Sequence, residues 1–137
     1  MNKILLDTNI ILDIALERRE FFETSKELMM TINNHSIPAF VSATTVTDIY
    51  YILKKSKGHH LTIAFLKNLF EFIDIIGVYK EVILIALDSE ITDFEDAVQT
   101  ECAVQNDINI IVTRNIADFK NSELKIFSPL EFIRKYL

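Results

Sequence analysis

The chain has 137 residues, of which half are hydrophobic, two are glycine, two are proline and one is cysteine. This composition is typical of one compact domain with a real core, and it excludes a disordered or low-complexity chain. The formal net charge of −6 argues against a broad, nonspecific nucleic-acid coat, which needs a basic surface. Charged residues interrupt the apolar runs within a few positions, so no membrane-spanning segment is expected.

The single cysteine, Cys102, excludes an internal disulfide and fits a reducing cytoplasm. The N-terminus has one lysine but no long apolar stretch before a small-residue cleavage site, so we interpret it as mature and not secreted. We therefore expect a cytoplasmic protein with no membrane association and a single domain over residues 1–137.

The first apolar run, residues 3–6, is short and ends in a turn signal, which predicts a strand buried on both faces. Thr8 and Asn9 favour the start of a helix directly afterwards. Asp7 would then lie at the carboxyl end of a strand, on the rim where open α/β sheets bind ligands. Asp13 closes the next apolar run and is interpreted as a helix-end or surface residue.

Ser42 and the residues after it open a helix that carries Asp48 in its first turns. The only basic run, residues 54–60, contains Gly58, which predicts the end of this helix and a solvated loop. A binding surface is the less favoured interpretation of that run.

Strands and helices alternate through the rest of the chain. Thr92 or Asp93 caps a helix that carries Asp96, and a buried strand that ends at Thr113 leads into a polar turn. The expected strands are residues 3–6, 37–41, 74–78, 110–113 and, weakly, 125–127, with helices over 23–34, 42–53, 61–72 and 80–89, from residue 92 or 93 to about 106, and from Pro129 onward. Such alternation predicts a three-layer α/β/α sandwich with a mostly parallel sheet of four to five strands.

Parallel strands would bring several acidic residues to one rim. Asp7, Asp48 and Asp96 are within possible reach of one point, whereas Glu95 is expected to point away from the face of Asp96. Carboxylates packed this closely need protons or a cation, and hard oxygen ligands select Mg²⁺ or Mn²⁺ over zinc. Arg114 is the preferred phosphate clamp beside this site. A weaker supporting group consists of Asp93, Asn115 and Asp118.

Four motifs, in order along nearly the whole chain, resemble those of PIN domains, and more narrowly the bacterial toxin ribonucleases of the VapC-like type. The motifs are LLDTNIILD at residues 5–13, SATTVTDIYY at 42–51, DFEDA at 93–97 and IVTRNIADF at 111–119. The resemblance implies a PIN-like fold and a metal-dependent endoribonuclease that cleaves single-stranded RNA. It also implies an antitoxin partner and a homodimer.

By position, the resemblance assigns Asp7, Asp48 and Asp96 to the acidic metal site, with Asn9 and Thr113 as its polar neighbours. Two positions depart from the family pattern. Asp48 stands where the family more often has glutamate, and its carboxylate is one methylene shorter. Asn115 stands where many members have aspartate; Asp118 is an alternative source of the missing carboxylate, and Asp93 is an assisting residue. These departures leave open whether one metal ion or two are bound.

Simpler interpretations accompany each assignment. Asp7 alone is as well explained as a helix cap, Asp48 as a solvated helix residue, and Asp93 as an N-cap. Asn115 and Asp118 fit a turn. The alternative function is a degenerate PIN module that binds metal or RNA without cleavage. A phospho-acceptor receiver is disfavoured, because no acceptor aspartate ends a middle strand and no lysine follows a late strand.

Overall fold

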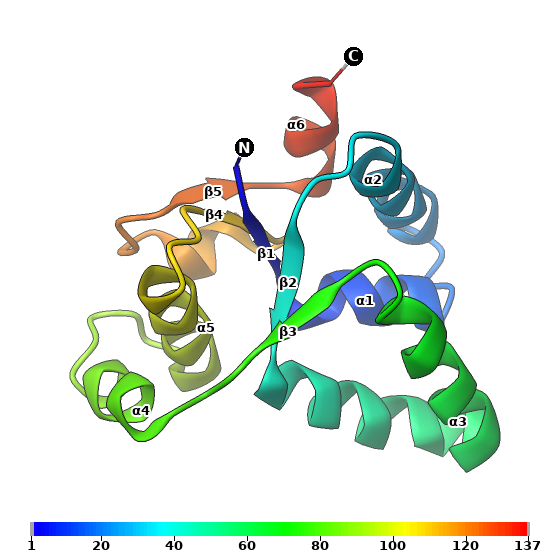
Figure 1. Cartoon of the computed structure of the whole chain (residues 1–137), viewed down its shortest axis with the longest axis horizontal. Helices are drawn as coiled ribbons and strands as arrows, with labels where there is room; N and C mark the ends of the chain where they lie inside the picture. Colours follow the sequence, from blue (N-terminus) through cyan, green and yellow to red (C-terminus); the bar gives the residue numbers. More distant parts are fainter. Residues whose placement is uncertain (1, 137) are drawn as a thin grey trace.

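Five parallel strands form one sheet in the order β3-β2-β1-β4-β5 (Figure 1). The computed structural model describes residues 2–136. The strands are β1 (Ile4–Leu6), β2 (Ala39–Ser42), β3 (Asp74–Ile76), β4 (Ile110–Val112) and β5 (Lys125–Phe127). The first strand therefore lies in the centre, which confirms the expected parallel sheet and explains why its sequence is a continuous apolar run.

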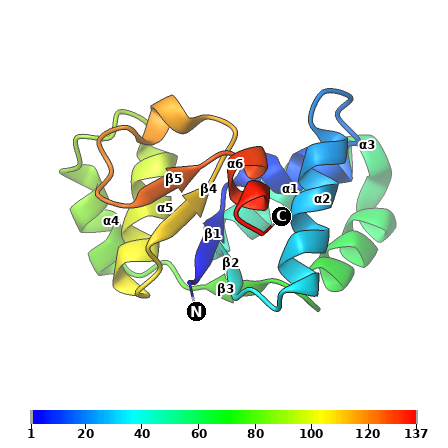
Figure 2. The same cartoon turned by 90° about the horizontal axis from the view of Figure 1, so that it is seen from above.

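Helices cover both faces of the sheet, so the three-layer prediction is confirmed (Figure 2). The α-helices are α1 (Thr8–Ala15), α2 (Phe22–Asn34), α3 (Ala43–Leu69), α4 (Lys80–Leu87), α5 (Phe94–Gln105) and α6 (Pro129–Arg134), with a 3-10 helix at Ile116–Phe119. Helices α4 and α5 lie on one side of the sheet, and α1, α2, α3 and α6 lie on the other. None of the helices in residues 2–136 combines the length and apolar character needed to cross a membrane.

Strand β1 supplies both halves of the hydrophobic core, because successive side chains of a strand point to opposite faces. Ile4 and Leu6 pack into the core beneath α1, α2, α3 and α6, whereas Leu5 packs into the core beneath α4 and α5. All three side chains are fully buried. The strand that ends at Asp7 is therefore held from both sides, which fixes the direction in which the chain leaves the sheet.

Strand register places the ends of β1 and β4 side by side. Leu6 pairs with Val112, and the Asp7 amide donates a hydrogen bond to the Val112 carbonyl oxygen at 3.0 Å. The next residues along the two strands, Asp7 and Thr113, thus emerge together at the carboxyl rim. Strand β2 ends on the same rim and leads directly into α3 through Ser42, its N-cap.

The expected loop after the basic run is wrong. The expected break at Gly58 is present, because its φ of 78° and ψ of 172° are non-helical, but the second helix follows directly and α3 consists of two helices joined at this kink. A side chain is strained at this φ, so glycine suits the kink, and the helix resumes at once. The second half is retained because Leu66 and Leu69 pack into the core.

The sequence suggested that Asp13 is a helix-end or surface residue, but its side chain is fully buried. Its carboxylate accepts hydrogen bonds from Arg18 Nη1 at 3.1 Å and from Arg114 Nε at 2.9 Å. The Arg114 guanidinium also stacks on Phe21, with 4.2 Å between Cζ and the ring centroid. Asp13 therefore ties the segment after α1 to the segment after β4.

Asp13→Asn is expected to lower the free energy of unfolding by about 2 kcal/mol, because two arginines lose the charge that compensates them in a partly buried position. Urea unfolding followed by circular dichroism measures the change. Asp88→Asn, at an exposed position, is the matched control and should change stability by less than about 0.5 kcal/mol. Equal effects of the two substitutions would contradict the structural role of Asp13.

Candidate active site

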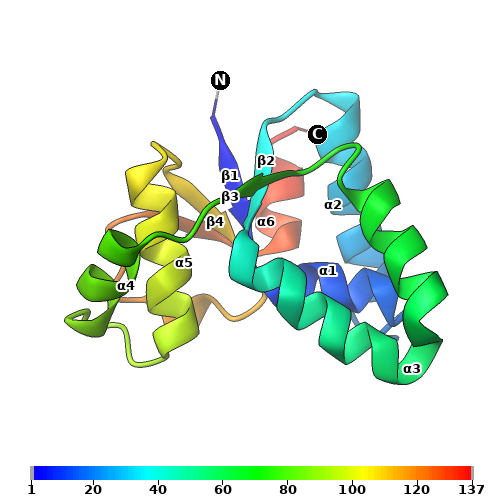
Figure 3. The same cartoon turned by 60° about the horizontal axis from the view of Figure 1, so that its bottom comes forward.

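An acidic cavity of about 380 Å³ opens at the carboxyl rim of the sheet. Figure 3 shows the first turns of α1, α3 and α5 gathered beside the ends of β1 and β2. The cavity is lined by six carboxylates and no lysine or arginine; its lining residues are Asp7, Thr8, Asn9, Leu12, Asp48, Ile52, Asp93, Glu95, Asp96, Asn115 and Asp118. The fold thus brings together the three aspartates on which the sequence-based site prediction depends.

Asp7 is the most enclosed of the six carboxylates, with 5% of its surface exposed. Although it occupies the N-cap position of α1, its side chain makes no capping hydrogen bond. Gln99 Nε2 instead donates to Asp7 Oδ1 at 3.1 Å, and Thr113 Oγ1 donates to Asp7 Oδ2 at 2.7 Å. The capping interpretation is therefore wrong for this side chain, which is oriented by two hydrogen bonds that stabilise a charged carboxylate.

Gln99 is a site residue that the sequence analysis missed. It lies in the middle of α5 and is fully buried, and its Oε1 has no hydrogen-bond partner among residues 2–136. The amide must face Asp7 with its nitrogen, because a carboxylate only accepts hydrogen bonds. A signal was present in the sequence: Gln99 is one helical turn beyond Asp96 on the same face.

Asp93 caps α5, as its spacing suggested, by accepting a hydrogen bond from the Asp96 amide at 3.0 Å. Asp96 itself is half-buried, and its pKa is raised from 3.8 to about 7. Burial is the largest cause, followed by repulsion from Asp7, Asp93, Asp118 and Glu95. The raised pKa therefore reflects burial first and repulsion by the neighbouring acids second, and a bound cation would counteract both.

The expectation that Glu95 points elsewhere is wrong. Glu95 lines the cavity, where its Oε1 accepts a hydrogen bond from Thr8 Oγ1 at 3.3 Å. Burial and the neighbouring Asp48 raise the pKa of its carboxyl. Helix periodicity predicts which residues share a face along the side of a helix. The cavity lies at the N-terminal end of α5, and Glu95 and Asp96 both reach it from the first turn.

A row of hydroxyl groups links the elements that carry the acids. Thr8 Oγ1 lies 2.8 Å from Thr45 Oγ1, and Thr45 Oγ1 lies 3.2 Å from Ser42 Oγ. The row joins the start of α1 to the end of β2 and the first turn of α3. Asp48 lies one turn further along α3, so its position relative to Asp7 is set through these contacts.

The supporting residues divide into two groups. Asn9, Asn115 and Asp118 line the cavity, whereas Thr113 is not part of its lining and donates a hydrogen bond to Asp7. Arg114, the predicted phosphate clamp, is not brought into the cavity. Its guanidinium is held instead by the Asp13 carboxylate and the Phe21 ring.

The donor set fits Mg²⁺ or Mn²⁺, since hard carboxylate oxygens surround the cavity. Within residues 2–136, no three histidine, cysteine, aspartate or glutamate side chains are grouped closely enough to form a preformed metal cage. Mg²⁺ keeps several water ligands and uses one or two carboxylates with substrate phosphate oxygens, so it does not require such a cage. Asp7, Asp48 and Asp96 are the residues that would hold it, and Glu95 lines the same cavity.

Several known proteins are similar to the chain along most of its length. Ribonuclease VapC1 of Aquifex aeolicus is 24% identical over 139 residues, which cover 98% of this chain and 95% of that protein. The structure of a toxin–antitoxin complex from Klebsiella pneumoniae contains a chain that is 21% identical, with a TM-score of 0.68 and coverage of 92% and 97% of the two chains.

The structure of VapC20 of Mycobacterium tuberculosis, described as a toxin that cleaves the sarcin–ricin loop, is 17% identical. Its TM-score is 0.61, and the match covers 79% of this chain and 86% of that one. Residues 3–117, which contain all of the cavity-lining residues except Asp118, match the family pattern of the PIN domain. The chain therefore belongs to the PIN-domain family.

Proposed function

We propose that this protein is a metal-dependent endoribonuclease that cleaves single-stranded RNA, and that it is the toxin of a toxin–antitoxin pair. The observation that carries the proposal is the cavity lined by six carboxylates, among them the enclosed Asp7, and by no lysine or arginine side chain. Membership of the PIN-domain family and the names of the similar proteins support it.

The protein's own residues supply orientation and charge. Gln99 and Thr113 hold Asp7 in one orientation, and the crowding of Asp96 and Glu95 by other acids keeps the cavity receptive to cations. Bound Mg²⁺ or Mn²⁺ would activate water and neutralise charge on the phosphate. Asn9 and Asn115 line the same cavity and carry amide groups able to hydrogen-bond a substrate phosphate or sugar.

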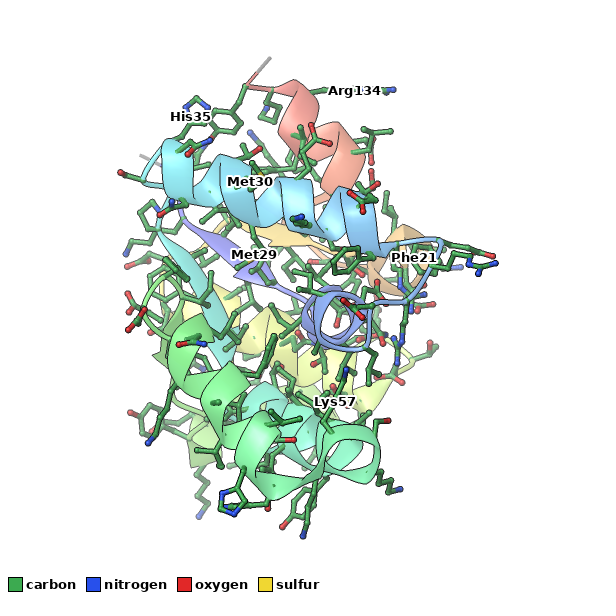
Figure 4. All side chains as sticks on the ribbon, turned by 90° about the vertical axis from the view of Figure 1, so that its right-hand side faces the viewer. Phe21, Met29, Met30, His35, Lys57 and Arg134 are labelled. Carbon is green, nitrogen blue, oxygen red and sulfur yellow. The ribbon has the colours of Figure 1, made fainter. Side chains whose placement is uncertain are left out.

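An antitoxin partner would cover exposed apolar surface. A groove of about 320 Å³ lies between α2 and the second half of α3, lined by apolar side chains that include Met29, Phe65 and Leu69. Figure 4 shows Met29 on the edge of α2 that faces α1, and Met30 on the outer side of the helix. Such a surface is typical of a protein interface.

A homodimer is part of the same proposal. Helix α4 exposes Leu84, Ile85 and Leu87 to solvent, each by half or more of its surface. Helix α4 is far from the groove between α2 and α3, so an antitoxin bound in that groove would not cover it (Figure 1). A second copy of the chain is the partner that we expect to cover these side chains.

Asp7→Asn and Asp96→Asn are each expected to reduce RNA cleavage by about 100-fold or more, because the cavity loses a metal-binding charge. The measurement is cleavage of a labelled single-stranded RNA with Mg²⁺ or Mn²⁺, and EDTA should abolish it. Asp88→Asn at an exposed position is the control and should retain wild-type activity. Metal binding without any RNA cleavage by the wild type would instead favour the degenerate module.

Glu95→Gln is expected to reduce cleavage by about 10-fold, because Glu95 shares the cavity with Asp48 and accepts a hydrogen bond from Thr8. Glu101→Gln, on the same helix but outside the cavity, provides the matched comparison. Steady-state cleavage rates at saturating Mg²⁺ distinguish the two variants. Unchanged activity of Glu95→Gln would restrict the site to the three aspartates.

Without metal, the stability of the wild type should fall as the pH rises from about 4 to about 7, because Asp96 binds its proton more tightly in the folded chain than in the unfolded one. Asp96→Asn should flatten this dependence. Urea midpoints in EDTA at pH 5 and pH 7.5 measure it, and added Mg²⁺ should stabilise the wild type more at pH 7.5. A pH dependence that is the same in wild type and variant would exclude Asp96 as its source.

A further inference from the structure

A compact cationic cluster lies beside the acidic cavity and has no role in the function proposed so far. It consists of Arg18 and Arg114, which share the fully buried Asp13, and its formal charge is +1. These are the only two ion pairs that the structure forms within residues 2–136, and both use the same carboxylate. A buried acid that neutralises only one of two neighbouring arginines leaves one positive charge for another partner.

The two arginines differ in how many of their guanidinium nitrogens are used in hydrogen bonds within the protein. Arg114 donates from both Nε and Nη2 to Asp13 and stacks on Phe21, so its guanidinium is locked against the protein. The Arg18 guanidinium hydrogen-bonds within the described chain through Nη1 alone, and a third of the side-chain surface is exposed. Arg18 therefore keeps Nε and Nη2 available for a ligand.

Arg18 is connected to the cavity through Asn9. Its Nη1 donates to Asn9 Oδ1 at 3.2 Å, and Asn9 lines the cavity. Since the amide oxygen of Asn9 is used by Arg18, the amide nitrogen is the group left for the cavity side. Both residues thus offer hydrogen-bond donors at a rim where every charged group of the cavity is an anion. Donors of this kind are suited to phosphate oxygens.

We propose that Arg18, positioned by Asp13, binds a backbone phosphate of the RNA strand beside the acidic cavity. This inference rests on the proposed ribonuclease function. It transfers the phosphate-binding role from Arg114, which is locked, to Arg18, which is held at one nitrogen and open at the others. Asp13 is a positioning residue, because it orients the guanidinium without reaching the cavity.

Binding of a fluorescein-labelled single-stranded RNA tests the proposal, with Mg²⁺ present and Asp96→Asn as the common background to prevent cleavage. Arg18→Gln should raise the Kd by about 10-fold, as expected for loss of one charge-assisted hydrogen-bonded contact. It should also reduce the slope of log affinity against log salt by about 0.7, because one phosphate contact is lost from a single strand. Circular dichroism verifies that the variants are folded.

Arg19→Gln is the matched control, because Arg19 is the next residue and exposed, and its removal changes the net charge by the same amount. It should change the Kd by less than about 2-fold, which is within about 0.5 kcal/mol. Arg18→Lys should restore most of the salt slope and part of the affinity, since it keeps the charge but not the planar donor fork. Equal effects of Arg18→Gln and Arg19→Gln, or an unchanged salt slope in Arg18→Gln, would overturn the proposal.

The two proposals fail in different ways. Absence of cleavage by the wild type, with weaker RNA binding by Arg18→Gln than by Arg19→Gln, removes the ribonuclease and retains the phosphate contact. In a cleaving wild type, Arg18→Gln should raise KM with little change in kcat, because it removes binding that is equal in the ground and transition states. A loss confined to kcat would overturn the phosphate-binding role and leave the ribonuclease in place.

Discussion

Repulsion between carboxylates is the constraint around which this site is built. Asp7 leaves a buried strand and is enclosed by protein, yet five other acids line the same cavity. The fold manages the repulsion in two ways. It satisfies Asp7 with two donors, Gln99 and Thr113, and it raises the pKa of the half-buried Asp96 through burial and then through repulsion by the neighbouring acids. A cavity with this electrostatic character favours cations over protons once the pH exceeds that pKa.

The rest of the architecture serves to keep those acids together. Central strand β1 is buried on both faces, and its register with β4 places Asp7 next to Thr113. Hydroxyl contacts between Thr8, Thr45 and Ser42 connect the starts of α1 and α3. Asp7, Asp48 and Asp118 come from segments that follow β1, β2 and β4, so their positions depend on parallel strands ending at one rim. The other three acids come from the start of α5, which follows α4.

Local sequence patterns were sufficient for the sheet, its parallel strands and the meeting of Asp7, Asp48 and Asp96, because these follow from apolar runs and helix starts. Contacts between distant side chains were not predictable in the same way. The pairing of Asp13 with Arg114 joins residues 101 positions apart, and nothing near either residue indicates it. Glu95 was misplaced because helix periodicity does not describe the space beyond a helix end. The helix after Gly58 continues because of core packing, which a local glycine signal does not contain.

Gln99 shows what the arrangement costs the fold. Its nitrogen must face Asp7, so its Oε1 is left buried without a donor among residues 2–136. An unsatisfied buried carbonyl lowers stability by about 1–3 kcal/mol, but a leucine there would remove that loss only by taking a hydrogen-bond donor away from the buried Asp7. The fold thus tolerates a local loss of stability at Gln99, whose amide nitrogen orients Asp7. Gln99 is therefore a position where orientation of a side chain toward the cavity and complete hydrogen bonding of the interior are not achieved together.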